Sequence, residues 1–400
     1  MKAAESDREF PWWWTAYFFL VPFGMPVSMG LVIGDLPAFG LLFLTLAKAL
    51  SGNPITSGKA EAWFVLFIGC SLLGIEVTGV PDFYLRELLA VLFLFACFKV
   101  TADFLNNRDR FERATAITGY AVISLLVINT LAVLSHNNLT YELTKSFLPD
   151  DKLSWPFEFS GQLGISLAVL YPICICIRNW SSPHRLIMHL MLIVNAGAIG
   201  SRSVFWLCLC EIFYVEAFIF STKSAVINVF KIIALLFSIG TVITFFGESF
   251  SFQRSLGQIK EIPLLFDEPR MMILRKALRT VPTWFQGYGL GCFKAFHGIE
   301  IHNTPLSILV ETGFIGLVSA ACFIGSILLA FWRSRTSQNA LIKHGLALSV
   351  FAILCNSMFR NLVSSRACWF VLALCYCFRH FQKDGAIDVP ANLGIPPKAF

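Results

Sequence analysis

The sequence predicts an all-α polytopic membrane protein with about 12 transmembrane helices. Of its 400 residues, 56% are hydrophobic and only 14% are charged, whereas ordinary soluble domains carry about 25% charged residues. The mean hydropathy is +0.69, and the apolar residues fall into runs long enough to cross a bilayer core of about 30 Å. These observations exclude a soluble globular enzyme and predict a chain embedded in lipid.

The predicted spans are bounded by polar residues, glycine or proline, and they leave little chain for a folded domain outside the membrane. We therefore expect residues 1–400 to form a single integral membrane domain, with an outer loop at 248–302 and a cytoplasmic tail at 381–400. The expected spans are 12–34, 36–50, 61–79, 84–100, 114–134, 160–178, 185–201, 203–221, 226–247, 304–332, 340–358 and 362–380.

The distribution of charge predicts the orientation of the chain. The formal net charge is +6, but the basic residues gather in alternate short connections instead of forming one patch, so we expect no nucleic-acid partner. The positive-inside rule places the connection that carries Arg108, Arg110 and Arg113 in the cytoplasm, together with both termini. Basic residues on the outer side are Arg86, Lys145, Lys152, Arg202, Arg360 and Arg366.

The outer loop contains a predicted interfacial helix at 268–285. Pro269 suits a first helical turn, and basic residues interrupt the apolar ones, a pattern typical of a helix that lies on a membrane surface. Pro282 is expected to end or kink this helix. The apolar residues at helical spacing are Met271, Leu274, Leu278, Val281 and Phe285.

Two outer arginines are candidates for binding a phosphate group. Arg202 lies in a connection so short that its guanidinium is held at the membrane edge. Arg270 lies in the first turn of the interfacial helix, where backbone N–H groups and the helix dipole favour an anion. A guanidinium adds planar, bidentate donors that match phosphate. Taken alone, Arg202 is better explained by snorkelling to the headgroups, and Arg270 by a charge that is simply solvated.

His302 is a candidate general base at the outer mouth of the protein. It precedes Asn303, Thr304 and Pro305, where Thr304 is expected to cap the next helix and Pro305 to begin it. An imidazole with its ordinary pKa of about 6.5 can accept a proton from a sugar hydroxyl. The alternative interpretation is a hydrogen-bonded loop histidine.

Glu311 is predicted to lie about 10 Å into the membrane, because it follows Thr304 by two helical turns. A buried carboxylate in a bilayer is costly and usually has a partner or a function. We interpret Glu311 as the partner of another group, and a role in the site stays open.

Two further patterns do not indicate a cofactor or a metal. The glycine-rich stretch 287–291 lacks the Lys-Ser/Thr pair of a phosphate loop and has no strand before it. His297 and His302 are five residues apart, which does not match the spacing of a helical zinc pair. We therefore expect neither a metal site nor a cofactor.

Together, two outer arginines and an outer histidine on a scaffold without a soluble domain suit a reaction between a membrane-anchored diphosphate and a hydroxyl. The sequence resembles the O-antigen ligase and O-antigen polymerase superfamily in an arginine followed by an Ala-Leu-bearing helix, a Gly-x-Gly turn, and His-Asn before a Glu-x-Gly-x-x-Gly span. The matching residues are Pro269 to Leu278, Gly287 to Gly291, His302, Asn303, Leu306, Glu311, Gly313 and Gly316, with Ser201 and Arg202 resembling an earlier outer motif.

The resemblance implies a metal-independent inverting glycosyltransferase in the bacterial inner membrane, with its active site on the periplasmic side. Its donor would be an undecaprenyl-diphosphate-linked glycan. Arg202 and Arg270 would hold the diphosphate and His302 would assist the acceptor hydroxyl, with Glu300 the next candidate for the base. Asn303, Glu311 and Glu300 would support the site. A diphosphate matched by arginine leaves readily, so no general acid is required.

The resemblance does not choose the acceptor. An O-antigen ligase acting on lipid A–core is our first expectation, and a repeat-unit polymerase for O-antigen or exopolysaccharide is the alternative. Relatives that glycosylate proteins share the same residues. A lipid-linked glycan transporter, a protein of another class, would also have many spans. Transporters commonly have paired helices broken by Gly or Pro, and we find no such pair in this sequence. A non-catalytic assembly partner would leave the clustered arginines and histidine without a purpose.

Overall fold

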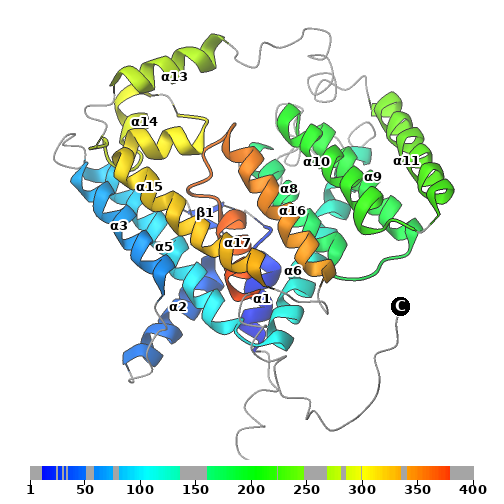
Figure 1. Cartoon of the computed structure of the whole chain (residues 1–400), viewed down its shortest axis with the longest axis horizontal. Coiled ribbons are helices and arrows are strands. Elements are labelled where there is room, and N and C mark those ends of the chain that lie inside the picture. Colours follow the sequence, from blue (N-terminus) through cyan, green and yellow to red (C-terminus); the bar gives the residue numbers. More distant parts are fainter. Residues whose placement is uncertain are drawn as a thin grey trace, which may run out of the picture.

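The computed structural model describes residues 11–23, 26–28, 31–32, 35–50, 58–74, 81–135, 160–222, 224–246, 268–280, 285–298, 300–334 and 340–378. This part of the chain is a bundle of helices with one short antiparallel strand pair (Figure 1). Its elements are α1 (Trp12–Leu20), β1 (Pro26–Ser28), β2 (Leu31–Val32), α2 (Asp35–Leu50), α3 (Lys59–Leu73), α5 (Pro81–Phe104), α6 (Arg108–Ser135), α8 (Ser160–Cys176), α9 (Ser182–Ala198), α10 (Arg202–Tyr214), the π-helical turn η2 (Val215–Ile219), α11 (Ala225–Phe246), α13 (Glu268–Thr280), α14 (Cys292–His297), α15 (Thr304–Arg333), α16 (Ala340–Ser357) and α17 (Arg366–Phe378).

Four of the described helices are long and apolar enough to cross a membrane: they comprise α6, α15, α16 and residues Ala225–Thr244 of α11. Helices α8 and α17 are shorter but also apolar. The predicted helical fold class and the presence of candidate membrane spans are thus confirmed for this part of the chain. The count of about 12 spans stays a prediction.

The core of the bundle is formed around α8 and α17. Every side chain from Leu163 to Cys176 and from Ala367 to Phe378 is buried, as expected for a helix that is apolar on all sides. Helix α16 packs along α8, α17 along α5, and α15 along α3. These pairings bring the ends of helices that are distant in sequence to the same side of the bundle.

Helix α11 has the opposite character and lies at the edge of the bundle (Figure 1). Many of its large apolar side chains face outward, with Phe230 68% and Phe237 77% exposed, whereas Leu235 is buried. Exposing such a surface to water would cost a free energy of roughly 25 cal/mol for each Å² of apolar area. Exposure of this kind is what a helix in contact with lipid requires.

The first predicted span is wrong in its extent. Residues 12–34 do not form one helix, because α1 ends at Leu20 and two strands follow, with Pro26 paired to Val32. Pro22 explains the end of α1, since a proline just beyond the last helical residue cannot continue the hydrogen-bond ladder.

Helix α13 runs across one end of the bundle, with α14 next to it (Figure 1). The predicted helix at 268–285 is correct at its start, but α13 spans only Glu268–Thr280, and Phe285 is not helical. The remainder of the expected outer loop up to residue 267 and the expected tail at 381–400 lie outside the described residues.

Candidate functional site

His302 lies in a bend immediately before α15, and its side chain is exposed. The preceding residue, Ile301, is buried, which holds the bend against the protein. Asn303 is the N-cap of α15: its Oδ1 accepts a hydrogen bond from the backbone N–H of Leu306 at 2.9 Å. The expectation that Thr304 caps this helix is therefore wrong. An asparagine in this position is as favourable as any capping residue and contributes about 1 kcal/mol.

The side chain of Thr304 instead binds the connection between α16 and α17, residues 358–365. Its Oγ1 donates to the carbonyl of Arg360 at 2.7 Å and accepts from the N–H of Leu362 at 2.9 Å. Asn303 contributes a third bond from its Nδ2 to the carbonyl of Met358 at 3.1 Å. The α16–α17 connection is thus fastened to the two residues that follow His302.

Arg202 is the first residue of α10, and its side chain is half-buried. Gly200, with a φ of 70°, ends α9 in the left-handed region and makes the short turn between the two helices feasible. The neighbouring Ser201 accepts a hydrogen bond from Nη2 of Arg360 at 3.2 Å. The α16–α17 connection therefore joins the start of α10, with Arg202, to the start of α15, with His302.

Arg270 lies in the first turn of α13, as expected, but its side chain lies outside the described part of the structure. The helix is attached by Ala277, which is fully buried and packs with Phe293, Ile301 and Val310. Ala277 is two turns, about 10 Å, from Arg270 along the helix axis. Because Ile301 precedes His302, this attachment brings α13 to the same end of α15.

The glycine-rich stretch 287–291 has a structural role at a break in α15. Gly313 has a φ of 73° and a ψ of 179°, which interrupts the helix. The backbone N–H of Tyr288 donates to the carbonyl of Val310 at 3.0 Å, and that of Gly289 to the carbonyl of Glu311 at 2.7 Å. A buried carbonyl without a partner would be costly, so the stretch satisfies the groups at the break.

We expect Gly287→Ala to destabilise the protein, because an added Cβ would overlap the backbone of Glu311 and Thr312. Overpacking of this kind costs about 1–3 kcal/mol. Thermal unfolding of the purified protein in detergent measures the effect. Gly325→Ala is the matched control, since Gly325 lies in α15 with nothing within 4 Å of the added Cβ. Equal melting temperatures for the two variants would contradict the close backbone contact.

Glu311 and Glu300, the two acidic residues expected to support the site, have different surroundings. Glu311 is buried, with 6% of its surface exposed, and its side chain bonds to the backbone of Gly291 and to Ser307. Glu300 is half-buried, and its Oε2 lies 3.5 Å from Nζ of Lys294. Glu311 thus helps to hold the glycine-rich stretch against α15, while Glu300 stays near the surface two residues before His302.

No metal centre is formed by the described residues: they contain no group of three or more His, Cys, Asp or Glu side chains that could hold an ion. His297, the second histidine of the predicted outer loop 248–302, packs its ring on Phe293, with centroids 4.6 Å apart. Burial and then the nearby Lys276 lower the pKa of His297. This lower pKa favours the neutral form of the ring.

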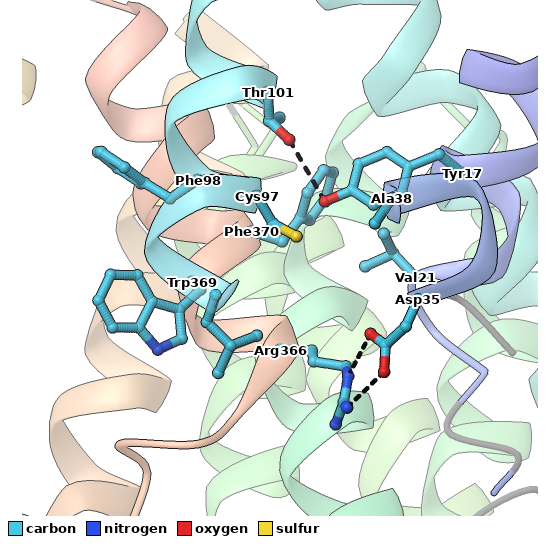
Figure 2. Close-up of a pocket in the computed structure, with 11 residues that line it drawn as sticks. Tyr17, Val21, Asp35, Ala38, Cys97, Phe98, Thr101, Arg366, Trp369 and Phe370 are labelled. Atoms are coloured by element: carbon cyan, nitrogen blue, oxygen red, sulfur yellow. Dashed lines mark hydrogen bonds and ion pairs between the residues drawn. The ribbon is translucent and has the colours of Figure 1, made fainter. Parts of the chain in front are cut away.

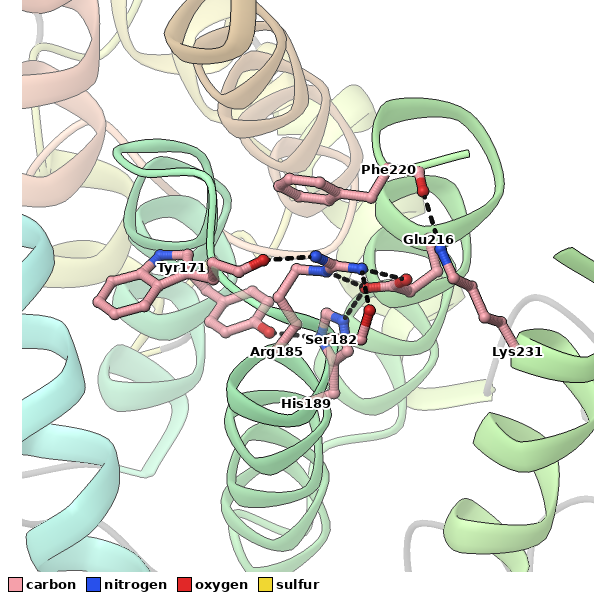
Figure 3. Close-up of polar contacts among 8 residues, drawn as sticks. Tyr171, Ser182, Arg185, His189, Glu216, Phe220 and Lys231 are labelled. Atoms are coloured by element: carbon pink, nitrogen blue, oxygen red, sulfur yellow. Dashed lines mark hydrogen bonds and ion pairs between the residues drawn. The ribbon is translucent and has the colours of Figure 1, made fainter. Parts of the chain in front are cut away.

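A second polar cluster joins α8, α9 and η2 (Figure 3). Arg185 makes two bonds to Glu216, from Nε at 2.6 Å and from Nη2 at 3.1 Å. Nε2 of His189 lies 3.1 Å from the same carboxylate, and Nδ1 lies 2.5 Å from the hydroxyl of Tyr171. A carboxylate only accepts, so the hydroxyl of Tyr171 donates to Nδ1 in neutral His189. By the predicted topology this cluster faces the cytoplasm, away from His302.

A small cavity of about 30 Å³ lies between α1, α2, α5 and α17. Figure 2 shows Arg366 and Asp35 at its edge, joined by bonds of 2.7 Å and 2.6 Å. The hydroxyl of Thr101 donates to that of Tyr17 at 3.3 Å on another side. The volume is that of about one water molecule, so this cavity is too small for a glycan or a diphosphate.

Arg360 is the residue of this site that the sequence analysis did not single out. It was recognised only as an outer basic residue, and its contacts with Ser201 and Thr304 join segments more than a hundred residues apart. One signal was available. Arg360, in the connection, and Arg366, at the start of α17, lie close together on the predicted outer side, against the usual bias of basic residues toward the cytoplasm.

No protein-family model matches the chain, and no curated protein matches it. The resemblance to O-antigen ligases and polymerases therefore rests on the motifs quoted above.

Proposed function

We propose that the protein is an inverting glycosyltransferase that moves a glycan from undecaprenyl diphosphate to a hydroxyl of a sugar acceptor at the periplasmic face. The acceptor we propose is lipid A–core, which makes the protein an O-antigen ligase. One observation carries the proposal: the α16–α17 connection binds the start of α15 beside His302 and the start of α10 beside Arg202. His302 and Arg202, the proposed base and one proposed phosphate-binding residue, are thus next to residues held by the same connection.

In this mechanism Arg202 and Arg270 bind the two phosphates of the donor, and His302 accepts the proton of the acceptor hydroxyl. The acceptor oxygen attacks the anomeric carbon from the side opposite the diphosphate, and the configuration inverts. The bond to the diphosphate breaks with its electrons on the departing oxygen. Arginines placed where that charge develops stabilise the transition state, so a general acid is not required.

The proposed location is the bacterial inner membrane, with about 12 spans and both termini in the cytoplasm. In intact cells, an impermeant thiol reagent should label Ala295→Cys, on the exposed side of α14, and should not label Gly58→Cys, before α3. The wild-type chain, whose own cysteines lie mainly in apolar helices, is the background control. If Gly58→Cys were labelled and Ala295→Cys were not, the orientation of the chain would be the opposite of the one proposed.

The decisive experiment supplies purified protein with a lipid-diphosphate glycan and either lipid A–core or no added acceptor, and separates the products by length. Transfer to lipid A–core supports the ligase. A ladder of longer lipid-linked glycans without added acceptor would identify a polymerase.

A transporter is the second candidate, and the break of α15 at Gly313 favours it, because broken helices are common in transporters. In this chain, however, the carbonyls of Val310 and Glu311 at the break bind Tyr288 and Gly289. A transporter would form no new glycosidic bond in the purified assay. If the protein moved the intact lipid-linked glycan across the membrane of proteoliposomes, a transporter would replace the glycosyltransferase as the proposed function.

We expect transfer without a divalent metal. Magnesium in proteins is usually held by one or two carboxylates and substrate phosphates, whereas the proposed phosphate-binding groups are the cations Arg202 and Arg270. Metal-stripped protein in EDTA should therefore retain its transfer rate. Loss of activity that magnesium or manganese restores would reject charge neutralisation by arginine alone and would point to Asp267, Glu268 or Glu300.

A further inference from the structure

Glu211 is an acidic residue buried in the predicted span 203–221. It lies in α10, with 1% of its surface exposed. Neither of its carboxyl oxygens has a hydrogen-bond partner among the described residues. An ionised carboxylate in this place would be a charge removed from water without compensation, so the carboxyl holds a proton. An ionisable group in a membrane is kept at a high cost and usually has a function.

The groups nearest to this carboxyl are weak acids from the neighbouring helices. Tyr171 of α8 and Cys355 of α16 lie within electrostatic range of Glu211, as does Cys208 in α10 itself. All three side chains are neutral in their protonated forms, so none of them compensates a negative charge on Glu211. Tyr171 also lies within electrostatic range of Glu216, which makes its hydroxyl a link between the two carboxyls.

Tyr171 begins a chain of hydrogen bonds that ends at Glu216 (Figure 3). Its hydroxyl donates to Nδ1 of His189 at 2.5 Å. Nε2–H of this neutral ring, from α9, donates to the carboxylate of Glu216 at 3.1 Å. A phenol and an imidazole each have a proton to give and a lone pair to receive one. The chain can therefore pass a proton from one end to the other.

The far end of the chain approaches the surface of the protein. Glu216 accepts two bonds from Arg185, and Nη2 of that guanidinium also donates to the exposed Ser182 at 3.4 Å. Glu216 lies in the π-helical turn η2, where the N–H of Phe220 donates to the carbonyl of Val215 at 2.9 Å. Turns of this kind are rare and are frequently found at functional sites.

We propose that Glu211 is a proton-binding site inside the membrane and that Glu216 exchanges this proton with it. The carboxyl of Glu211 gives its proton to the hydroxyl oxygen of Tyr171, whose own proton passes to Nδ1 of His189. The Nε2 proton of that ring then passes to the carboxylate of Glu216. Glu211 is now the carboxylate and accepts a bond from Tyr171, while Glu216 is the acid.

This exchange moves one proton and leaves the total charge of the cluster unchanged. No net charge is created in the apolar interior, where it would be most costly. Glu216, at the end near Ser182, then exchanges its proton with water on the predicted cytoplasmic side. The protein thus takes up and releases a proton at the end of the bundle opposite His302, an activity that glycan transfer does not use.

The proton on Glu211 is detected by infrared spectroscopy of the full-length protein in detergent at neutral pH. A protonated carboxyl has a carbonyl band that shifts when its proton is replaced by deuterium. Glu211→Gln should remove one such band, and Glu211→Asp, which keeps the carboxyl, should move it. Glu112→Gln is the matched control, because Glu112 is partly exposed and bound to Arg108 at 2.8 Å. That variant should keep the band.

The rate at which this band shifts in D₂O tests the path of the proton. Tyr171→Phe should keep the band and slow its shift by about 10²-fold, the lower limit for a positioned proton-transfer group. His189→Gln should slow it as well, since an amide can donate and accept but does not pass a proton on. Tyr120→Phe is the control, because Tyr120 is exposed on α6, and it should exchange at the wild-type rate.

The outcomes separate the site from its path and from the proposed function. If neither Glu211→Gln nor Glu211→Asp changed a band of protonated carboxyl, the proton-binding site would be rejected. Equal exchange rates in the wild type, Tyr171→Phe and His189→Gln would reject the path. Thermal unfolding in detergent identifies a variant that has lost its fold, and the other variant of the same pair then decides. None of these measurements uses a glycan, so the absence of glycan transfer would reject the proposed function and leave this inference standing.

Discussion

His302→Ala should reduce glycan transfer by about 10²- to 10⁴-fold, the usual contribution of a general base. Donor binding should be largely retained, because the imidazole is proposed to contact the acceptor hydroxyl. The cap of α15 should also persist, since Asn303 and not His302 makes the bond to Leu306. The measurements are kcat with the lipid-diphosphate donor and, separately, binding of that donor to the variant.

His297→Gln is the matched control for this prediction. His297 lies five residues earlier, and its ring packs on Phe293, where it has no proposed contact with substrate. Its transfer rate should stay near that of the wild type once the protein level is equal. If His302→Ala kept more than roughly a tenth of the wild-type rate, below the range for a base, the role would belong elsewhere, with Glu300 the next candidate.

Arg202→Lys and Arg270→Lys should each lose transfer at unchanged protein level. A lysine keeps the charge but not the planar pair of donors that matches a phosphate. The expected loss is about 3 kcal/mol, the scale of removing a preorganised donor to a developing oxyanion. Rates at saturating and limiting donor show whether the loss falls on kcat or on donor binding.

Arg279→Lys is the control on the same helix as Arg270. Arg279 is exposed in the last turn of α13, so exchanging it should leave the rate near that of the wild type. A low rate in Arg279→Lys would indicate that α13 as a whole depends on its surface charge. Near-normal turnover in both Arg202→Lys and Arg270→Lys would reject the diphosphate clamp.

Composition and local pattern were sufficient to predict the broad class of this protein. A high apolar content in long runs indicates membrane helices because an unpaired backbone group in lipid is costly, and a helix satisfies these groups within itself. The start of α13 near Pro269 and the start of α15 near Pro305 follow from equally local signals. These are properties of short stretches of chain and need no knowledge of what packs against them.

Other features depend on contacts between distant segments. Thr304 and Asn303 are both good capping residues, and only the position of the α16–α17 connection determines that Thr304 binds Arg360 while Asn303 caps α15. In the sequence, the glycine-rich stretch 287–291 looks like an ordinary loop. In the structure, Gly313 breaks α15, and the carbonyls of Val310 and Glu311 accept hydrogen bonds from the backbone of Tyr288 and Gly289.

The sequence by itself therefore determined the helical class, the presence of apolar helices long enough to span a membrane and most of the helix starts. The residues suited to a diphosphate and a hydroxyl stay a prediction. Tertiary structure alone decided that Arg360 reaches Ser201 beside Arg202 and that Ala277 attaches α13 near His302. The reason is physical. A side chain's local preference is set by its neighbours in sequence, whereas the partner of a long guanidinium is set by which helix ends the packing of the bundle brings together.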